Sequence, residues 1–235
     1  MLNTNNLNKN NTYISIWLYL SLFLVSSLIF IGGLTRLTES GLSITNWEIL
    51  SGILPPLTEK KWEEYFSLYK KIPQYKEINF GMSLAEFKYI FWWEYIHRIL
   101  ARLASLVFIL PFIYFLIKKI LSFKQIVLYS IISFLFFFQG FLGWYMVKSG
   151  LILKTDVSHF RLSVHLLGAQ IILSLIFFSI LFRNVKKIHF NINSYLIIFF
   201  LLLVYLQIVI GAFVSGLDAA KIYQTWPLMN GNFVP

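Results

Sequence analysis

Trp92-Trp93-Glu94-Tyr95-Ile96-His97-Arg98 is the stretch that decides the fold, because it sets ionisable groups inside an apolar run that covers about residues 89–117. An ionisable side chain within a membrane span is costly, so its presence there indicates a functional site. Glu94 and His97 are three residues apart and therefore share one face of a helix. The sequence predicts a membrane helix that carries a carboxylate and an imidazole on one face.

The composition of the chain is typical of a membrane protein. Of its 235 residues, 58% are hydrophobic and only 13% are charged, which is too apolar for a water-soluble domain. The net charge of +10 is explained by Lys and Arg in short loops, so we expect no nucleic-acid partner. Cysteine is absent, which leaves no disulfide, thiolate metal site or cysteine nucleophile in this chain.

The apolar segments predict an all-α membrane protein with five transmembrane helices. We expect a disordered tail at 1–12, a four-helix bundle at 13–183 with a long outer loop at 36–82, and the start of a second bundle at 184–235. The expected spans cover about residues 13–34, 83–117, 125–147, 158–183 and 194–216.

Local signals refine this picture. Ser83 with Glu86 predicts a capping box at the start of the second span. Trp62, Phe66 and Tyr69 recur at helical spacing, which predicts a short amphipathic helix on the membrane surface, with an irregular loop as the alternative.

Basic loops set the expected orientation. The loops after the second and fourth spans are short and rich in Lys and Arg, and such loops stay in the cytoplasm. We therefore expect a multi-pass protein of the cell inner membrane, with a cytoplasmic N-terminus and the end of this chain outside.

The first and fifth spans end alike. Gly32 and Trp47 recur as Gly211 and Trp226, at the same offset of 179 positions. Chance similarity between apolar spans is the alternative, but the shared spacing favours internal duplication. On that interpretation four spans form one unit, the fifth opens a second pseudo-symmetric bundle, and the chain is a C-terminally truncated product.

Two histidines suggest a haem site. His97 and His165 lie on parallel spans, and the helical rise puts both roughly 8 to 12 Å below the outer surface. Two imidazoles at equal depth suit axial ligation of a haem iron, whereas zinc would need further nitrogen, sulfur or carboxylate ligands. The other interpretation is that each histidine only hydrogen-bonds to a neighbouring helix.

Further polar residues lie near the same level. Glu94 is the candidate catalytic residue, able to move a proton or to stabilise a developing cation. Gln139, in the third span, is expected to hydrogen-bond between helices. Four arginines are candidates to bind haem propionates, with snorkelling to lipid headgroups as the alternative: Arg36, Arg98, Arg102 and Arg161.

Four motifs in this order resemble those of the haem A synthase family, and together they cover nearly the whole chain. The long outer loop without cysteines is similar to the mitochondrial and alphaproteobacterial branch. The motifs are Gly32-Gly33-Leu34-Thr35-Arg36, Glu94-Tyr95-Ile96-His97-Arg98, Arg161-Leu162-Ser163-Val164-His165 and Thr225-Trp226-Pro227-Leu228-Met229-Asn230-Gly231.

The resemblance implies two four-helix bundles and the conversion of haem O to haem A, by two successive hydroxylations of the C8 methyl to a formyl group, for cytochrome c oxidase assembly. It implies His97 and His165 as axial ligands of the substrate haem iron, and Glu94 as the acid needed for activity. The family binds haem b in its second bundle, through histidines without counterparts in this chain. Implied partners are haem O, haem A, haem O synthase, an electron acceptor and the lipid bilayer, with a homo-oligomer left open.

Three other functions stay open at this point. A bis-His b-type electron carrier would use the same two histidines, but it needs no carboxylate such as Glu94 on the ligand face. A small transporter or assembly subunit would bind no haem at all. An inactive truncated product would keep the motifs without turnover.

Overall fold

The computed structural model describes residues 4–47, 51–153, 155–183 and 191–233. These residues are helical apart from turns and one isolated β-bridge between Met229 and Asn232. Five of the helices are long and apolar enough to cross a membrane, which confirms the predicted fold class. The elements are α1 (Thr4–Leu37), η1 (Ser51–Ile53), α2 (Glu59–Tyr69), α3 (Pro73–Glu77), α4 (Leu84–Ile117), α5 (Phe123–Leu153), α6 (His159–Phe182), α7 (Ile192–Gly216) and α8 (Ala219–Ile222).

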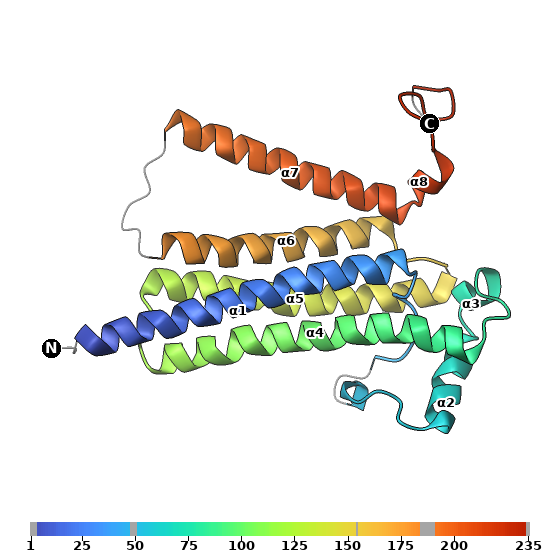
Figure 1. Cartoon of the computed structure of the whole chain (residues 1–235), viewed down its shortest axis with the longest axis horizontal. Coiled ribbons are helices and arrows are strands. Elements are labelled where there is room, and N and C mark those ends of the chain that lie inside the picture. Colours follow the sequence, from blue (N-terminus) through green and yellow to red (C-terminus); the bar gives the residue numbers. More distant parts are fainter. Residues whose placement is uncertain (1–3, 48–50, 154, 184–190, 234–235) are drawn as a thin grey trace.

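Four helices form a closed ring. α1 packs against α4 and α6, and α5 packs against the same two helices from the other side, so the order around the ring follows the chain (Figure 1). α4 and α6 are therefore diagonal to one another across the bundle. This arrangement puts the two helices that carry the predicted haem ligands on opposite sides of the bundle interior.

The end of the bundle that holds the N-terminus is closed by an aromatic core. Trp17 packs against Phe108, Phe115 and Tyr129, with ring centroids 5.0, 5.4 and 5.1 Å away, and its indole N–H donates to the Val107 carbonyl at 2.9 Å. A buried indole with its N–H satisfied stabilises a membrane core through both dispersion and hydrogen bonding. The predicted site residues Glu94, His97 and Arg98 lie toward the opposite end of the bundle.

The outer loop folds onto the start of α4. Thr58 caps α2 by accepting from the Lys61 N–H at 3.3 Å, so the predicted helix is confirmed. The prediction that the apolar face of α2 lies on the membrane surface was wrong, because that face packs on α4 instead. Phe66 stacks on Phe87 at 5.0 Å and Trp62 packs on Phe91 at 4.9 Å, because α4 extends outward far enough to offer an aromatic surface of its own.

α1 begins earlier than predicted. It is helical from Thr4, so helix replaces most of the segment for which a disordered tail was expected. The segment contains neither Gly nor Pro, and extending an existing helix needs no new nucleus.

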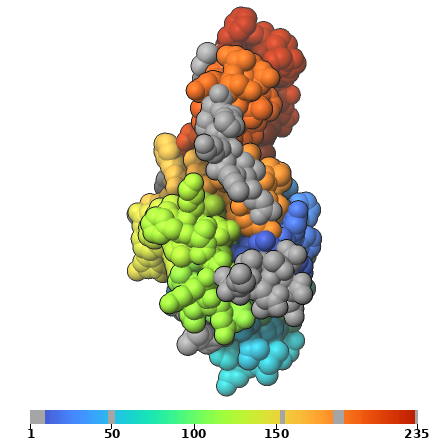
Figure 2. Space-filling model, turned by 90° about the vertical axis from the view of Figure 1, so that its left-hand side faces the viewer, coloured from blue at the N-terminus to red at the C-terminus, as the bar shows by residue number. Residues whose placement is uncertain are grey.

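α7 lies outside the ring and packs along α6. Only 6% of its most apolar stretch is buried, against 33% for α1. In Figure 1 it diverges from α6 toward its N-terminal end, and Figure 2 shows α7 and α8 as a lobe projecting from the bundle. α7 is the helix for which the sequence predicts the start of a second bundle, and this stays a prediction.

The ends of α1 and α7 share an unusual backbone. Glu39 and Asp218 are 179 positions apart and both adopt left-handed conformations, with φ of 53° and 51°. Each donates its N–H to the carbonyl three residues earlier, at 3.1 and 3.2 Å. Lys119 after α4 has the same φ of 53° and donates in the same way to the Leu116 carbonyl at 3.0 Å, so this backbone is a recurring way of ending a helix in this chain and internal duplication stays a prediction.

Candidate functional site

The two predicted ligand histidines lie in the outer half of the bundle, on the diagonal helices α4 and α6. Their chain neighbours Ile96 and Val164 are exposed on the outside of the bundle, which turns the imidazoles inward. His97 borders Gly32 of α1, and His165 contacts Gln139 of α5. Both predicted ligand histidines therefore turn toward the interior of one bundle, and their joint binding of one haem stays a prediction.

Each imidazole borders a glycine on a neighbouring helix. A Cβ atom added to Gly32 of α1 would lie 3.2 Å from Nε2 of His97, and one added to Gly143 of α5 would lie 3.7 Å from Cε1 of His165. Glycine at position 32 therefore lets α1 lie close against the His97 ring, whereas a Cβ atom at position 143 would make an ordinary contact with the His165 ring. Two imidazoles inside one apolar bundle are the donor set that a haem iron takes.

Gln139 of α5 contacts His165 directly. In the amide orientation that satisfies all its neighbours, Nε2 donates to His165 Nδ1 at 2.7 Å and Oε1 accepts from the Ala169 N–H at 3.3 Å. The predicted interhelical hydrogen bond is therefore present. Its partner, a ring nitrogen of the candidate haem ligand, was not foreseen.

Glu94 is bound to the outer loop. Its carboxylate accepts from Ser43 Oγ at 2.7 Å, from the Ile44 N–H at 2.8 Å and from Arg98 Nη2 at 2.5 Å, and the residue is only 3% exposed. A buried carboxylate is tolerated only when it is paired and hydrogen-bonded in this way. Glu94 thus fastens the start of the outer loop to α4 one turn from His97.

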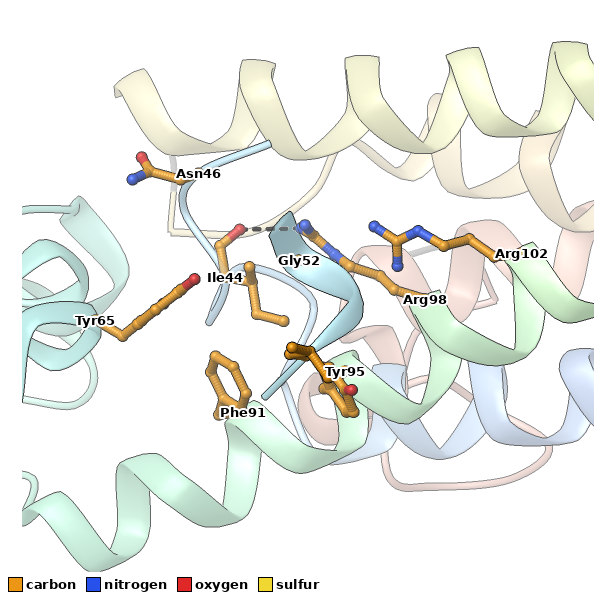
Figure 3. A pocket seen from close by; sticks show the side chains of 9 residues that line it. Ile44, Asn46, Gly52, Tyr65, Phe91, Tyr95, Arg98 and Arg102 are labelled. Atoms are coloured by element: carbon orange, nitrogen blue, oxygen red, sulfur yellow. Dashed lines mark hydrogen bonds between the residues drawn. The ribbon is translucent and has the colours of Figure 1, made fainter. Parts of the chain in front are cut away.

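Arg98 and Arg102 line a small hollow under the outer loop. Arg98 Nη2 also donates to the Ile44 carbonyl at 2.9 Å, and its guanidinium stands over the Trp47 ring at 5.3 Å. Figure 3 shows both guanidinium groups pointing from α4 toward the loop. The hollow encloses about 20 Å³, which is room for one water molecule, so it is a positive spot beside the histidine site rather than a haem pocket.

The other two arginines bind protein groups. Arg36 donates to the Ser215 carbonyl at 2.5 Å and pairs with Asp218 at 3.3 Å and Asp156 at 3.7 Å. This joins the end of α1 to the end of α7. Burial raises the pKa of Asp156, which the charge of Arg36 partly offsets.

Arg161 binds α5 instead. It donates to Ser149 Oγ and, at 3.3 Å, to the Tyr145 hydroxyl, and its guanidinium lies 4.3 Å from the centre of the Tyr145 ring. The structure therefore brings Arg98 and Arg102 together but places Arg36 and Arg161 at separate helix contacts.

Comparison with known proteins shows the family of the chain. The family described as cytochrome oxidase assembly protein matches residues 15–235. A haem A synthase of Pelagibacter ubique is 53% identical over 226 residues, covering 95% of this chain and 67% of its own length. That of Rickettsia bellii is 46% identical over 225 residues, covering 93% and 67%.

A third relative, the haem A synthase of Wolbachia pipientis subsp. Culex pipiens, is 46% identical over 227 residues, covering 94% of this chain and 68% of its own length. No solved structure matches the chain. The chain spans about two thirds of the length of these relatives. Because the family matches from the first span to the end of the chain and the relatives agree with it at these identities, the chain belongs to the cytochrome oxidase assembly family, as a relative of the haem A synthases.

Proposed function

We propose that this chain acts in the conversion of haem O to haem A, the oxidation of the C8 methyl to a formyl group in two successive hydroxylations, for cytochrome c oxidase assembly. The observation that carries the proposal is the pair of inward-facing imidazoles, His97 and His165, on diagonal helices of one bundle. The family relationship supports this function over a plain electron carrier.

His97 and His165 are the proposed axial ligands of the substrate haem iron. Both are imidazole side chains inside an apolar bundle, and such side chains are common ligands of haem iron. Gly32 and Gly143 contribute by letting α1 and α5 approach the edges of the two rings. Bound in this way, the haem would supply the iron chemistry, and the protein would supply orientation and a dry surrounding.

Glu94 is the proposed catalytic carboxylate. Both of its oxygens accept hydrogen bonds from Ser43, Ile44 and Arg98. With its acceptor sites used in this way, Glu94 is better suited to stabilise positive charge that develops near the haem edge than to carry a proton.

Arg98 and Arg102 are the proposed propionate ligands. They project from α4 within five residues of His97 and line one positive hollow, and guanidinium groups bind carboxylates in a bidentate manner. Arg36 and Arg161, the other two candidates, lie at separate helix contacts and do not line this hollow, so we assign them positioning roles.

Cofactor, partners and location follow from the same proposal. Haem b and an electron acceptor would serve the reaction, and haem O synthase would deliver the substrate. We place the chain in the inner membrane with its N-terminus in the cytoplasm, because Lys118, Lys119 and Arg183 gather at that end of the bundle and basic loops stay inside.

The test is extraction of the haems bound to the chain, purified from a host that makes haem O, followed by chromatography. We expect haem O or haem A in the wild type and a severe loss in His97→Ala and His165→Ala. His159→Ala is the matched control, since this histidine packs on Phe213 of α7 rather than facing the bundle. Haem b alone would favour the electron carrier, and full haem retention in both variants would overturn the ligand assignment.

A further inference from the structure

α5 contributes a second set of contacts to one of the two imidazoles. Besides its 2.7 Å contact with Nδ1 of His165, the Gln139 amide nitrogen donates to the His165 carbonyl at 3.2 Å. The amide therefore touches the ring and the backbone of the same residue. A side chain held at three points is well placed to fix the rotation of the ring it contacts.

Two glycines lie next to this contact between Gln139 and His165. The Gln139 amide occupies the place where a Cβ atom of Gly168 would lie. One turn along α5, Gly143 borders the Cε1 edge of the His165 ring, 3.7 Å from where its Cβ atom would lie. Residues 139 and 143 on α5, and 165 and 168 on α6, thus form one interlocking unit around a single imidazole.

The contact decides which ring nitrogen is available. With Nδ1 facing the amide, Nε2 is the nitrogen that remains for a metal. An imidazole that binds iron through Nε2 carries its proton on Nδ1, and that proton needs an acceptor. An amide has an acceptor end and a donor end, and a half-turn of its last side-chain bond exchanges the two.

We propose that Gln139 is a positioning residue for His165 that changes its role with haem binding. In the haem-free chain its NH₂ group donates to Nδ1. If Nε2 bound the haem iron, the amide would turn, giving up its bonds to the His165 carbonyl and the Ala169 N–H, and its carbonyl would accept the Nδ1–H. That bond would hold the ring in place and make it a stronger electron donor to the iron. This inference rests on the proposed role of His165 as a haem ligand.

Two substitutions with opposite expected effects test the proposal. Gln139→Met keeps the length of the side chain but cannot accept the Nδ1 proton. Gln139→Glu keeps the shape and accepts that proton more strongly. The matched control is Gln207→Met on α7, a glutamine that also stands four residues before a glycine but is exposed. Each full chain is purified from the haem O-producing host, and haem affinity and reduction potential are measured.

Gln139→Met should bind haem about 10- to 100-fold more weakly and shift the reduction potential upward, because the ligand donates less charge to the ferric iron. Gln139→Glu should shift the potential downward, and Gln207→Met should leave it unchanged. A purely structural role for Gln139 would not give shifts of opposite sign, so shifts in the same direction, or none, would overturn the proposal. A wild type without haem, or His165→Ala with an unchanged haem spectrum, would instead overturn the proposed function on which it rests.

Discussion

At the scale of single residues, the site is an anchored carboxylate beside an imidazole. The cost of ionisable groups in a membrane made Glu94, His97 and Arg98 predictable from the sequence. Their partners were not, because Ser43 and Ile44 lie 51 and 50 positions away in the chain. No helical spacing connects such residues, and only the path of the folded loop brings them together.

The anchoring of Glu94 yields the first prediction. Ser43→Ala should weaken the attachment of the outer loop by about 1–3 kcal/mol, since it leaves a buried carboxylate with one donor fewer. Glu94→Gln should weaken it by about 3–5 kcal/mol, because it breaks a buried ion pair with Arg98. The rate of limited proteolysis in the outer loop reports this opening.

Ser26→Ala serves as the control for the loss of a hydroxyl, because Ser26 Oγ donates only within its own helix, to the Leu22 carbonyl at 2.9 Å. We expect its effect to stay within about 0.5 kcal/mol. Equal proteolysis of Ser43→Ala and Ser26→Ala would show that Glu94 does not anchor the loop.

Adjacent glycines in α1 give the second prediction. Gly32→Ala should push the His97 ring aside by a few tenths of an ångström, at a cost of about 1–3 kcal/mol in haem binding. Gly33→Ala, whose Cβ would meet nothing within 4 Å, should bind haem like the wild type and gain up to about 1 kcal/mol of helix stability. Haem titration of both variants distinguishes them, and equal affinities would contradict the close packing of α1 on His97.

At the scale of elements, hydropathy and capping signals predicted most of the structure. The capping box of α4 is present, with the Ser83 N–H donating to Glu86 Oε2 at 2.8 Å and the Glu86 N–H donating to Ser83 Oγ at 3.3 Å. The position of α2 could not be predicted, because an amphipathic face that packs on protein looks the same in sequence as one that lies on lipid.

The outer segment yields the third prediction. Burial raises the pKa of Tyr69 to about 12, and its hydroxyl donates to Gln74 Oε1 at 3.0 Å and accepts from Asn79 Nδ2 at 2.8 Å. A group with a raised folded-state pKa stabilises the fold fully below its ordinary pKa of 10, and this contribution is lost as the pH rises through 12.

Tyr69→Phe should therefore lower the stability of the outer segment by about 1 kcal/mol at neutral pH. It should also remove part of the loss that the wild type shows between about pH 10 and 12. Proteolysis of the outer loop as a function of pH measures both effects, with Tyr75→Phe as the control for removing a phenol from the same segment. A pH dependence in Tyr69→Phe identical to that of the wild type would contradict the burial of the phenol.

At the scale of the whole molecule, the repeat was visible in the sequence but its consequence was not. Gly and Trp spacing predicted that α1 and α7 are equivalent. The structure adds that the two equivalent ends bind each other through an ion cluster. Arg36 of α1 pairs with Asp218 beyond α7, and Lys221 pairs with both Glu39 and Asp218, at 2.8 and 3.3 Å. Such pairing between repeats depends on their packing, which a repeat offset does not specify.

This cluster carries the last prediction. α7 buries little apolar surface, so its outer end should depend on Asp218 for its position beside α1. In Asp218→Asn, spin labels on the exposed residues Leu37 and Leu217 should show a broader distance distribution than in the wild type. Each partly exposed ion pair contributes only about 0.2–1 kcal/mol, and the Debye length near 1 M salt is about 3 Å. Salt at that concentration should therefore broaden the wild-type distribution in the same way.

Glu59→Gln is the control: it removes a partner of Lys88 on α4 and should leave the distances between the two spin labels unchanged. If Asp218→Asn kept the narrow distribution as well, packing against α6 alone would position α7.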